Sequence, residues 1–258
     1  MGWHDISLIP PDFVALTIDL SGPQDNAWDL FGNEDELGML NLLTPDPVAA
    51  AAKEIQTGVC ISLDLPLNFS LYPCWEKKEL ARETSDDAAR NVGGPMNDDI
   101  VTFNTQGSVP WDGYRHFVWL KNGGIQRRGI LVDWADWASK KGIERPRKAY
   151  KGMNAEQQKT MSERRSPEFI GLEPGEESLK WIWDSRFAAV AGDSVGFEEL
   201  PPSPKQLQSR RMPIGELFDL KELAEYYKRT GRYSFFPSTV PLKIQGGVAS
   251  PPNAVAIF

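Results

Sequence analysis

The sequence has only two cysteines and two histidines in 258 residues, and it has no long apolar run. Cys60 and Cys74 could form one disulfide, but so few cysteines are more typical of a reducing compartment. The N-terminus has no basic segment followed by an apolar run, so we expect no signal peptide. No apolar stretch is long enough to cross a bilayer. These absences argue against a membrane protein and predict a cytoplasmic one.

Long basic stretches are also missing. The net charge is −8 and the pI is about 5.0, and the basic cluster at residues 145–151 is short and local. A chain that tracks phosphates needs a basic patch or stripe, so we expect no nucleic-acid partner. The 41% hydrophobic and 25% charged residues are typical of a globular protein that can bury one large core. Composition leaves assembly into a homo-oligomer open.

The apolar pattern predicts a mixed α/β protein with one domain, residues 34–258, after an N-terminal arm, residues 1–33, rich in Pro, Gly and Asp. Stripes at helical spacing, caps and stop signals predict helices at 44–56, 134–141, 154–164, 176–186 and 220–230. In the first of these, Val48, Ala51, Ala52 and Ile55 are expected to face the core. Alternating or apolar runs predict strands at 59–65, 99–104, 129–133, 187–190, 235–244 and 255–258. We expect 129–133 to be buried on both faces, and 68–97 to be an irregular exposed excursion that covers a cleft.

The chemically most informative stretch is TQGSVPWDGYRH, which ends in one of the two histidines. Asp112 and His116 lie four positions apart, after a predicted strand and among turn-forming glycines, serine and proline. A carboxylate and an imidazole on one turn can share a metal ion or pass a proton. Alternatively, Asp112 caps the turn and His116 packs beside aromatic neighbours, and residue types alone favour this second interpretation. The other histidine, His4, is expected to be a solvated residue near the terminus.

The string WDGYRH resembles the end of the signature H-x-G-T-H-x-D-x-P-x-H of the cyclase superfamily, which includes kynurenine formamidases. Asp112 matches its aspartate and His116 its last histidine. Further blocks resemble the large fungal and bacterial branch of this family in the expected order: residues 28–45, 128–134, 188–193, 212–220 and 246–258. The resemblance implies a kynurenine formamidase/cyclase-like mixed β/β/α fold. It also implies an arylformamidase-like hydrolase or cyclase acting on an amide, lactone or polyketide-like carbonyl compound, as in the kynurenine branch of tryptophan catabolism.

The resemblance also implies a metal site. In the family, a divalent metal, zinc or manganese, is held by the first two signature histidines and the aspartate, with a later histidine and glutamate. Carried over, Asp112 and Glu216 are metal ligands and His116 is the catalytic proton carrier.

The chain departs from this pattern at several ligands. Gln106 and Pro110 stand where the ligand histidines belong, and residues 202–211 hold no later histidine. Gln106 offers only an amide oxygen as a ligand, so a carboxylate-rich site would favour a harder ion such as manganese or magnesium and bind it weakly. Segments 121–127 and 145–151 join blocks that are several dozen residues further apart in relatives, which indicates either a trimmed member, without a peripheral strand, or a faulty gene model.

Two functions therefore remain open: a metal-dependent hydrolase or cyclase, and a non-catalytic binding scaffold that keeps the fold after losing metal ligands. The family fold implies the same geometry for both functions. Asp112, His116 and Glu216 should converge in one pocket although they are far apart in sequence, and Gln106 should point into it if it replaces a ligand.

Overall fold

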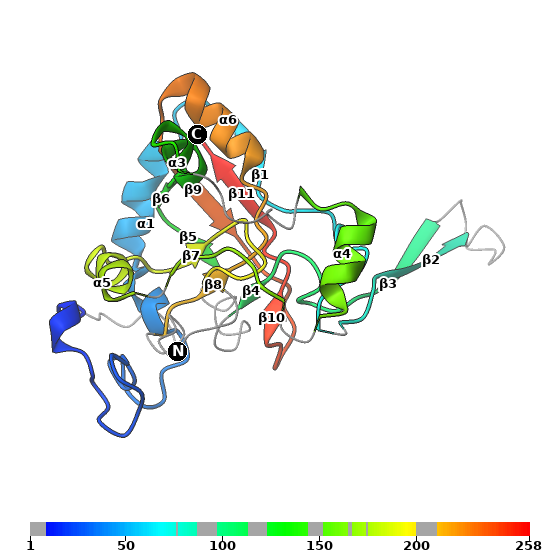
Figure 1. Ribbon diagram of the computed structural model, residues 1–258. Coiled ribbons are helices and arrows are strands. Elements are labelled where there is room, and N and C mark those ends of the chain that lie inside the picture. Colours follow the sequence, from blue (N-terminus) through cyan, green and yellow to red (C-terminus); the bar gives the residue numbers. More distant parts are fainter. Residues whose placement is uncertain are drawn as a thin grey trace, which may run out of the picture.

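Three β-sheets and several short helices make up the fold of the computed structural model, which describes residues 9–75, 77–86, 97–112, 123–143, 152–164, 167–173, 175–199 and 211–258 (Figure 1). The largest sheet has the order β1-β11-β9-β5, and β6 also pairs with β9. All of its pairings are antiparallel. Its strands are β1 (Cys60–Ser62), β5 (Ile125–Gln126), β6 (Gly129–Ile130), β9 (Ser234–Thr239) and β11 (Ala254–Ile257).

The second sheet has the order β10-β4-β8-β7 and brings distant parts of the chain together. It consists of β4 (Trp111–Asp112), β7 (Val190–Ala191), β8 (Ile214–Gly215) and β10 (Ala249–Ser250). β4 and β8 are antiparallel, with Trp111 opposite Gly215 and Asp112 opposite Ile214. β7 and β8 are parallel. This register brings the stretch around Asp112 next to a segment more than one hundred residues later.

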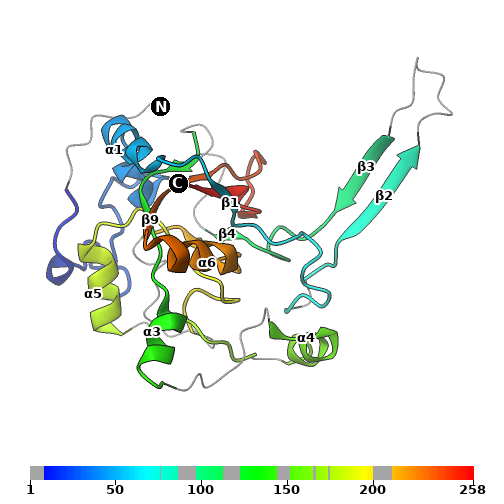
Figure 2. The same ribbon diagram turned by 90° about the horizontal axis from the view of Figure 1, so that it is seen from above.

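The third sheet is a two-stranded hairpin of β2 (Ala81–Asp86) and β3 (Asn97–Thr102). It projects away from the rest of the described chain in both views (Figures 1 and 2). Arg82 and Asp99 pair across it at 2.9 Å, and Ile100 and Val101 are exposed.

All five predicted helices are confirmed. They are α1 (Pro45–Ala51), continued by the 3₁₀ turn η3 (Ala52–Glu54), α3 (Trp134–Lys140), α4 (Ala155–Ser162), α5 (Glu176–Asp184) and α6 (Lys221–Thr230). Two further 3₁₀ turns are η1 (Phe13–Ala15) and η2 (Gly38–Leu42). α4 has a reciprocal capping box between Asn154 and Gln157, and α6 ends at Gly231 with a φ of 72°. No helix in the described part of the chain is long and apolar enough to cross a membrane.

Side chains from helices and sheets form one domain with two buried clusters. In the larger cluster, α6 packs on the first sheet through Leu223 and Tyr226, and the Tyr226 ring lies 4.2 Å from that of Phe258. In the smaller cluster, α5 buries Trp183 against Phe13, and the Phe13 backbone N–H donates to Asp184 at 2.9 Å. The described part of the N-terminal segment is thus fixed to the body through η1.

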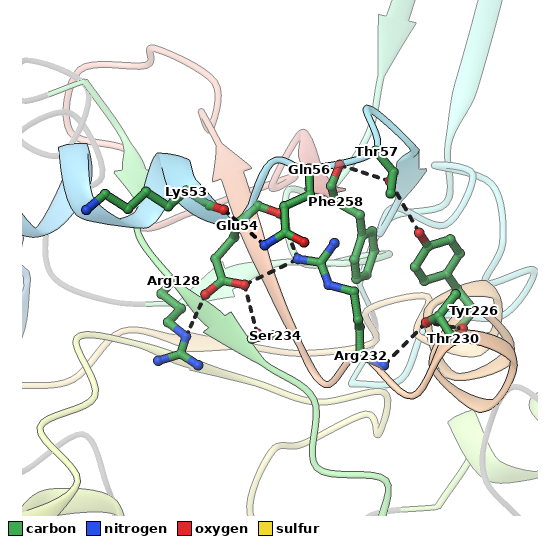
Figure 3. A network of polar contacts seen from close by, with 10 residues as sticks. All are labelled: Lys53, Glu54, Gln56, Thr57, Arg128, Tyr226, Thr230, Arg232, Ser234 and Phe258. Atoms are coloured by element: carbon green, nitrogen blue, oxygen red, sulfur yellow. Dashed lines mark hydrogen bonds and ion pairs between the residues drawn. The ribbon is translucent and has the colours of Figure 1, made fainter.

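A polar network around Glu54 joins η3, β6 and β9 (Figure 3). The Glu54 carboxylate accepts from Ser234 Oγ at 2.8 Å and pairs with Arg128 at 2.9 Å and with Arg232 at 3.4 Å. Arg232 also donates to the Glu54 carbonyl at 2.8 Å. Close by, Thr57 Oγ1 donates to the carbonyl of Phe258 at 3.1 Å. The network fixes the C-terminal strand pair to the segment after α1.

Several expectations from the sequence are wrong. The stretch 68–97 contains strand β2, whose polar sequence ARETSD carries no apolar alternation because the hairpin projects into solvent. The run 129–133 is not buried on both faces: Ile130 and Val132 are 45% and 64% exposed. In the first helix only Ala51 is buried, while Ala52 and Ile55 are exposed. The strand expected at 187–190 is β7, and it starts at the last of these residues.

Candidate functional site

Asp112 and Glu216 lie on neighbouring strands of the second sheet. Asp112 is the last residue of β4, and Glu216 directly follows β8. The Glu216 backbone N–H donates to the carbonyl of Pro110 at 3.0 Å, which extends the ladder between the two segments. The two carboxylates therefore lie within electrostatic reach of each other.

Gln106 reaches the same place from the turn before β4. The Asn104 side chain accepts the Gln106 backbone N–H at 2.9 Å and stabilises the turn. The Gln106 side-chain amide donates from Nε2 to Asp112 Oδ1 at 2.8 Å. Gln106 thus points toward Asp112, and it offers a donor to that carboxylate.

Lys77 also belongs to the site, although no pattern in the sequence marks it as a candidate site residue. Its Nζ donates to the Gln106 backbone carbonyl at 3.0 Å and lies 5.2 Å from the centre of the Trp75 ring. Electrostatic interactions couple the ammonium group to Glu216 and Asp112. A cation therefore lies within electrostatic reach of the two carboxyl groups.

Three of these four residues line a narrow pocket with a free interior of about 20 Å³, which is room for roughly one water-sized group. Lys77, Gln106 and Glu216 form its polar wall. The remaining lining residues are Ser70, Pro73, Cys74, Trp75, Gly107, Ser108, Pro110, Val195 and Leu217.

Burial controls the charge in this pocket. Loss of water contact, together with the nearby Asp112 carboxylate, raises the pKa of Glu216 to about 8, although Lys77 and the Phe197 backbone N–H act in the opposite direction. Burial lowers the pKa of Lys77, and Glu216 and Asp112 oppose that change. Burial also raises the pKa of the Cys74 thiol, so this free cysteine is a poor nucleophile.

The described donor set does not match a zinc or manganese centre. No group of three or more His, Cys, Asp or Glu side chains among the described residues could hold a metal ion. Asp112 and Glu216 supply two carboxylates, but Gln106 directs its amide N–H₂ at one of them and Lys77 adds a positive charge. A structural or catalytic zinc site has at least three protein ligands. A third ligand would have to come from outside the described residues, where both His116 and His4 lie.

The structure thus brings together three of the four predicted site residues, Asp112, Gln106 and Glu216. Their roles stay predictions, as does the role of His116. Lys77 lies in the polar run EKKE, which is typical of a solvated loop, and only the proximity of Trp75 and Cys74 distinguishes it in sequence. Its position depends on long-range packing that no local pattern carries.

Comparisons with known proteins agree with this architecture. No protein-family model matches the chain, and no curated protein matches it either. Among solved structures, one of a novel cyclase aligns with a TM-score of 0.71 and 22% identity, over 90% of this chain and 99% of that chain. Isatin hydrolase A from Ralstonia solanacearum aligns with a TM-score of 0.55 and 13% identity, over 83% of this chain and 98% of that chain.

A protein described as a predicted metal-dependent hydrolase, from Bacillus stearothermophilus, aligns with a TM-score of 0.46 and 14% identity, over 78% of this chain and 98% of that chain. The cyclase alignment at a TM-score of 0.71 shows that the chain has the cyclase fold expected from its sequence.

Proposed function

We propose that this chain is a hydrolase or cyclase that acts on the carbonyl group of a small amide, lactone or polyketide-like compound. The observation that carries the proposal is that Gln106 and Glu216 line one pocket from separate parts of the chain, and that the Gln106 amide holds Asp112 within electrostatic reach of Glu216. The fold supports it, because one structure with this fold is an isatin hydrolase and isatin is a cyclic amide.

Two neighbouring carboxyl groups can carry the proton transfers of such a reaction. One, ionised, takes a proton from water while the water oxygen forms a bond to the carbonyl carbon. The C–N or C–O bond of the resulting tetrahedral species then breaks, and the leaving atom takes a proton from the other carboxyl group, which holds one. In an internal cyclisation, a nucleophilic atom of the substrate replaces the water.

Gln106 is a positioning residue in this scheme. Its amide N–H₂ holds Asp112 Oδ1 at 2.8 Å, which fixes the direction of that carboxylate. His116 was predicted to move a proton, and it keeps that role as a prediction.

The test is a turnover assay with N-formylkynurenine, isatin and simple aryl lactones, each with and without added zinc or manganese. We expect turnover of at least one substrate and a loss of about tenfold or more in Asp112→Asn. Asp46→Asn, at an exposed position in the first turn of α1, is the matched control and should keep full activity. Absence of turnover in folded protein with every substrate and metal would refute the proposal.

The alternative is a non-catalytic scaffold that keeps the pocket for binding. Gln106 and Pro110 at the positions of ligand histidines favour it, and so does the ammonium group beside the carboxylates. A scaffold would bind members of the substrate panel without converting them, and calorimetry beside the turnover assay separates the two functions.

We further propose a cytoplasmic protein with a small-molecule substrate, no nucleic-acid or membrane partner, and assembly into a homo-oligomer. Light scattering after size exclusion tests the assembly: a mass near 28.9 kDa would show a monomer.

A further inference from the structure

We infer that Lys77 is the resident cation of this pocket, and that its ammonium group takes the electrostatic place of the divalent metal implied by the family resemblance. Asp112 and Glu216 would then hold an internal cation in place of a metal ion. The prediction that Lys77 takes the place of a metal does not depend on the proposed function. The additional role of Lys77, donating a hydrogen bond to a substrate carbonyl oxygen, rests on it.

The position of Lys77 is fixed by contacts from several segments. The Gln106 carbonyl accepts one of the three N–H donors of Lys77 at 3.0 Å, and the side chain lies beside the Trp75 ring. The same Gln106 holds Asp112 through its side chain at 2.8 Å. Gln106 therefore connects the Lys77 ammonium group to the Asp112 carboxylate through two hydrogen bonds, whereas a solvated surface lysine would have no such fixed partner.

The charge balance of the pocket also disfavours a second cation. Asp112 and Glu216 are the two carboxyl groups within electrostatic reach of Lys77, and they can carry at most two negative charges, while Lys77 already supplies a positive one. A divalent ion bound there would face the ammonium group at short range in a partly buried space, where like charges repel more strongly than in water. The free interior of about 20 Å³ accommodates roughly one oxygen-sized group.

An ammonium group can perform one part of a metal's task but not all of it. It can donate a hydrogen bond to a carbonyl oxygen and stabilise the negative charge that develops there. It cannot lower the pKa of a bound water as a metal does, so deprotonation of the water falls to a carboxylate. Lys77 and the carboxylate pair therefore divide the work that one metal centre would do.

The experiment is a calorimetric titration of the full-length, chelator-treated protein with MnCl₂ and with ZnCl₂. Lys77→Ala removes the ammonium group, Lys77→Arg keeps the charge, and Lys78→Ala changes the adjacent exposed lysine as the matched control. Wild type, Lys77→Arg and Lys78→Ala should show no saturable binding in the micromolar range. Lys77→Ala should bind Mn²⁺ at least about tenfold more tightly than wild type, because the positive charge that repels a second cation near Asp112 and Glu216 is removed.

Two results would overturn the inference. One is wild-type binding of one metal equivalent at micromolar affinity that disappears in Asp112→Asn. The other is folded Lys77→Ala with no gain in affinity. If Lys77→Ala does not fold, Lys77→Met, which keeps the length and apolar stem of the side chain, replaces it and is judged by the same criterion. The titration needs no substrate, so a failed turnover assay would refute the proposed function alone.

Discussion

Glu216 should make the stability of the protein fall as the pH rises from weakly acidic to weakly alkaline. Its pKa is about 8 in the folded protein against 4.5 as the ordinary value, because burial and Asp112 disfavour its charged form. Between these two values the folded state keeps a proton that the unfolded state has lost. The stabilisation is fully present below pH 4.5 and is lost as the pH rises through about 8. At about 1.4 kcal/mol per pKa unit, the whole interval corresponds to at most about 5 kcal/mol.

Urea unfolding at pH 5, 6.5 and 8, followed by tryptophan fluorescence, measures this effect. The Glu216→Gln variant has no carboxyl group to ionise, so its free energy of unfolding should fall with pH by at least about 2 kcal/mol less than that of the wild type. Glu225→Gln, at an exposed position on α6, should follow the wild type. Lys77, Asp112 and Glu198 are the charged groups that act on Glu216, and all three are retained in both variants. Equal pH dependence in wild type and Glu216→Gln would refute the interpretation of Glu216 as a buried carboxyl group that holds its proton.

Two further predictions concern the frame that positions the pocket. Glu54→Ala leaves the half-buried Arg232 and Ser234 without their carboxylate partner and should lower the free energy of unfolding by roughly 2 kcal/mol. The control Lys53→Ala, at an exposed position, should change the free energy of unfolding little. Equal urea midpoints for the two variants would contradict this prediction. Gly38 has a φ of 57°, and an added Cβ would lie 2.2 Å from the Arg211 carbonyl oxygen. Gly38→Ala should therefore cost about 2 kcal/mol or more, while Gly152→Ala, with open space around its Cα, should be nearly neutral in thermal melts.

Local patterns predicted the helices well because each carries its own signals. Asn154 caps α4, and Leu179, Ile182 and Trp183 form the buried face of α5. Strand β2 was missed because its side chains face solvent on a projecting hairpin, and burial is what produces an apolar alternation. The exposed Ile130 and Val132 show the converse, since an apolar run does not specify how much of it the fold covers.

In the site too, residues that belong to a sequence motif could be predicted, whereas a residue placed only by tertiary packing could not. The family resemblance led to Asp112, Gln106 and Glu216, and the antiparallel pairing of β4 with β8 explains why the two carboxylates meet. Lys77 could not be found this way, because a lysine in a polar loop has the same local pattern whether it is solvated or folded back beside a carboxylate. Its place depends on the hydrogen bond of its ammonium group to the turn at Gln106, which lies 29 residues further along the chain.

The most direct test of the resident cation is a crystal structure of the protein soaked in MnCl₂, with data collected near the manganese absorption edge. We predict no anomalous peak between Asp112 and Glu216, and Lys77 Nζ within hydrogen-bond distance of the Gln106 carbonyl oxygen. An anomalous peak coordinated by both carboxylates, with Lys77 turned away, would contradict the account.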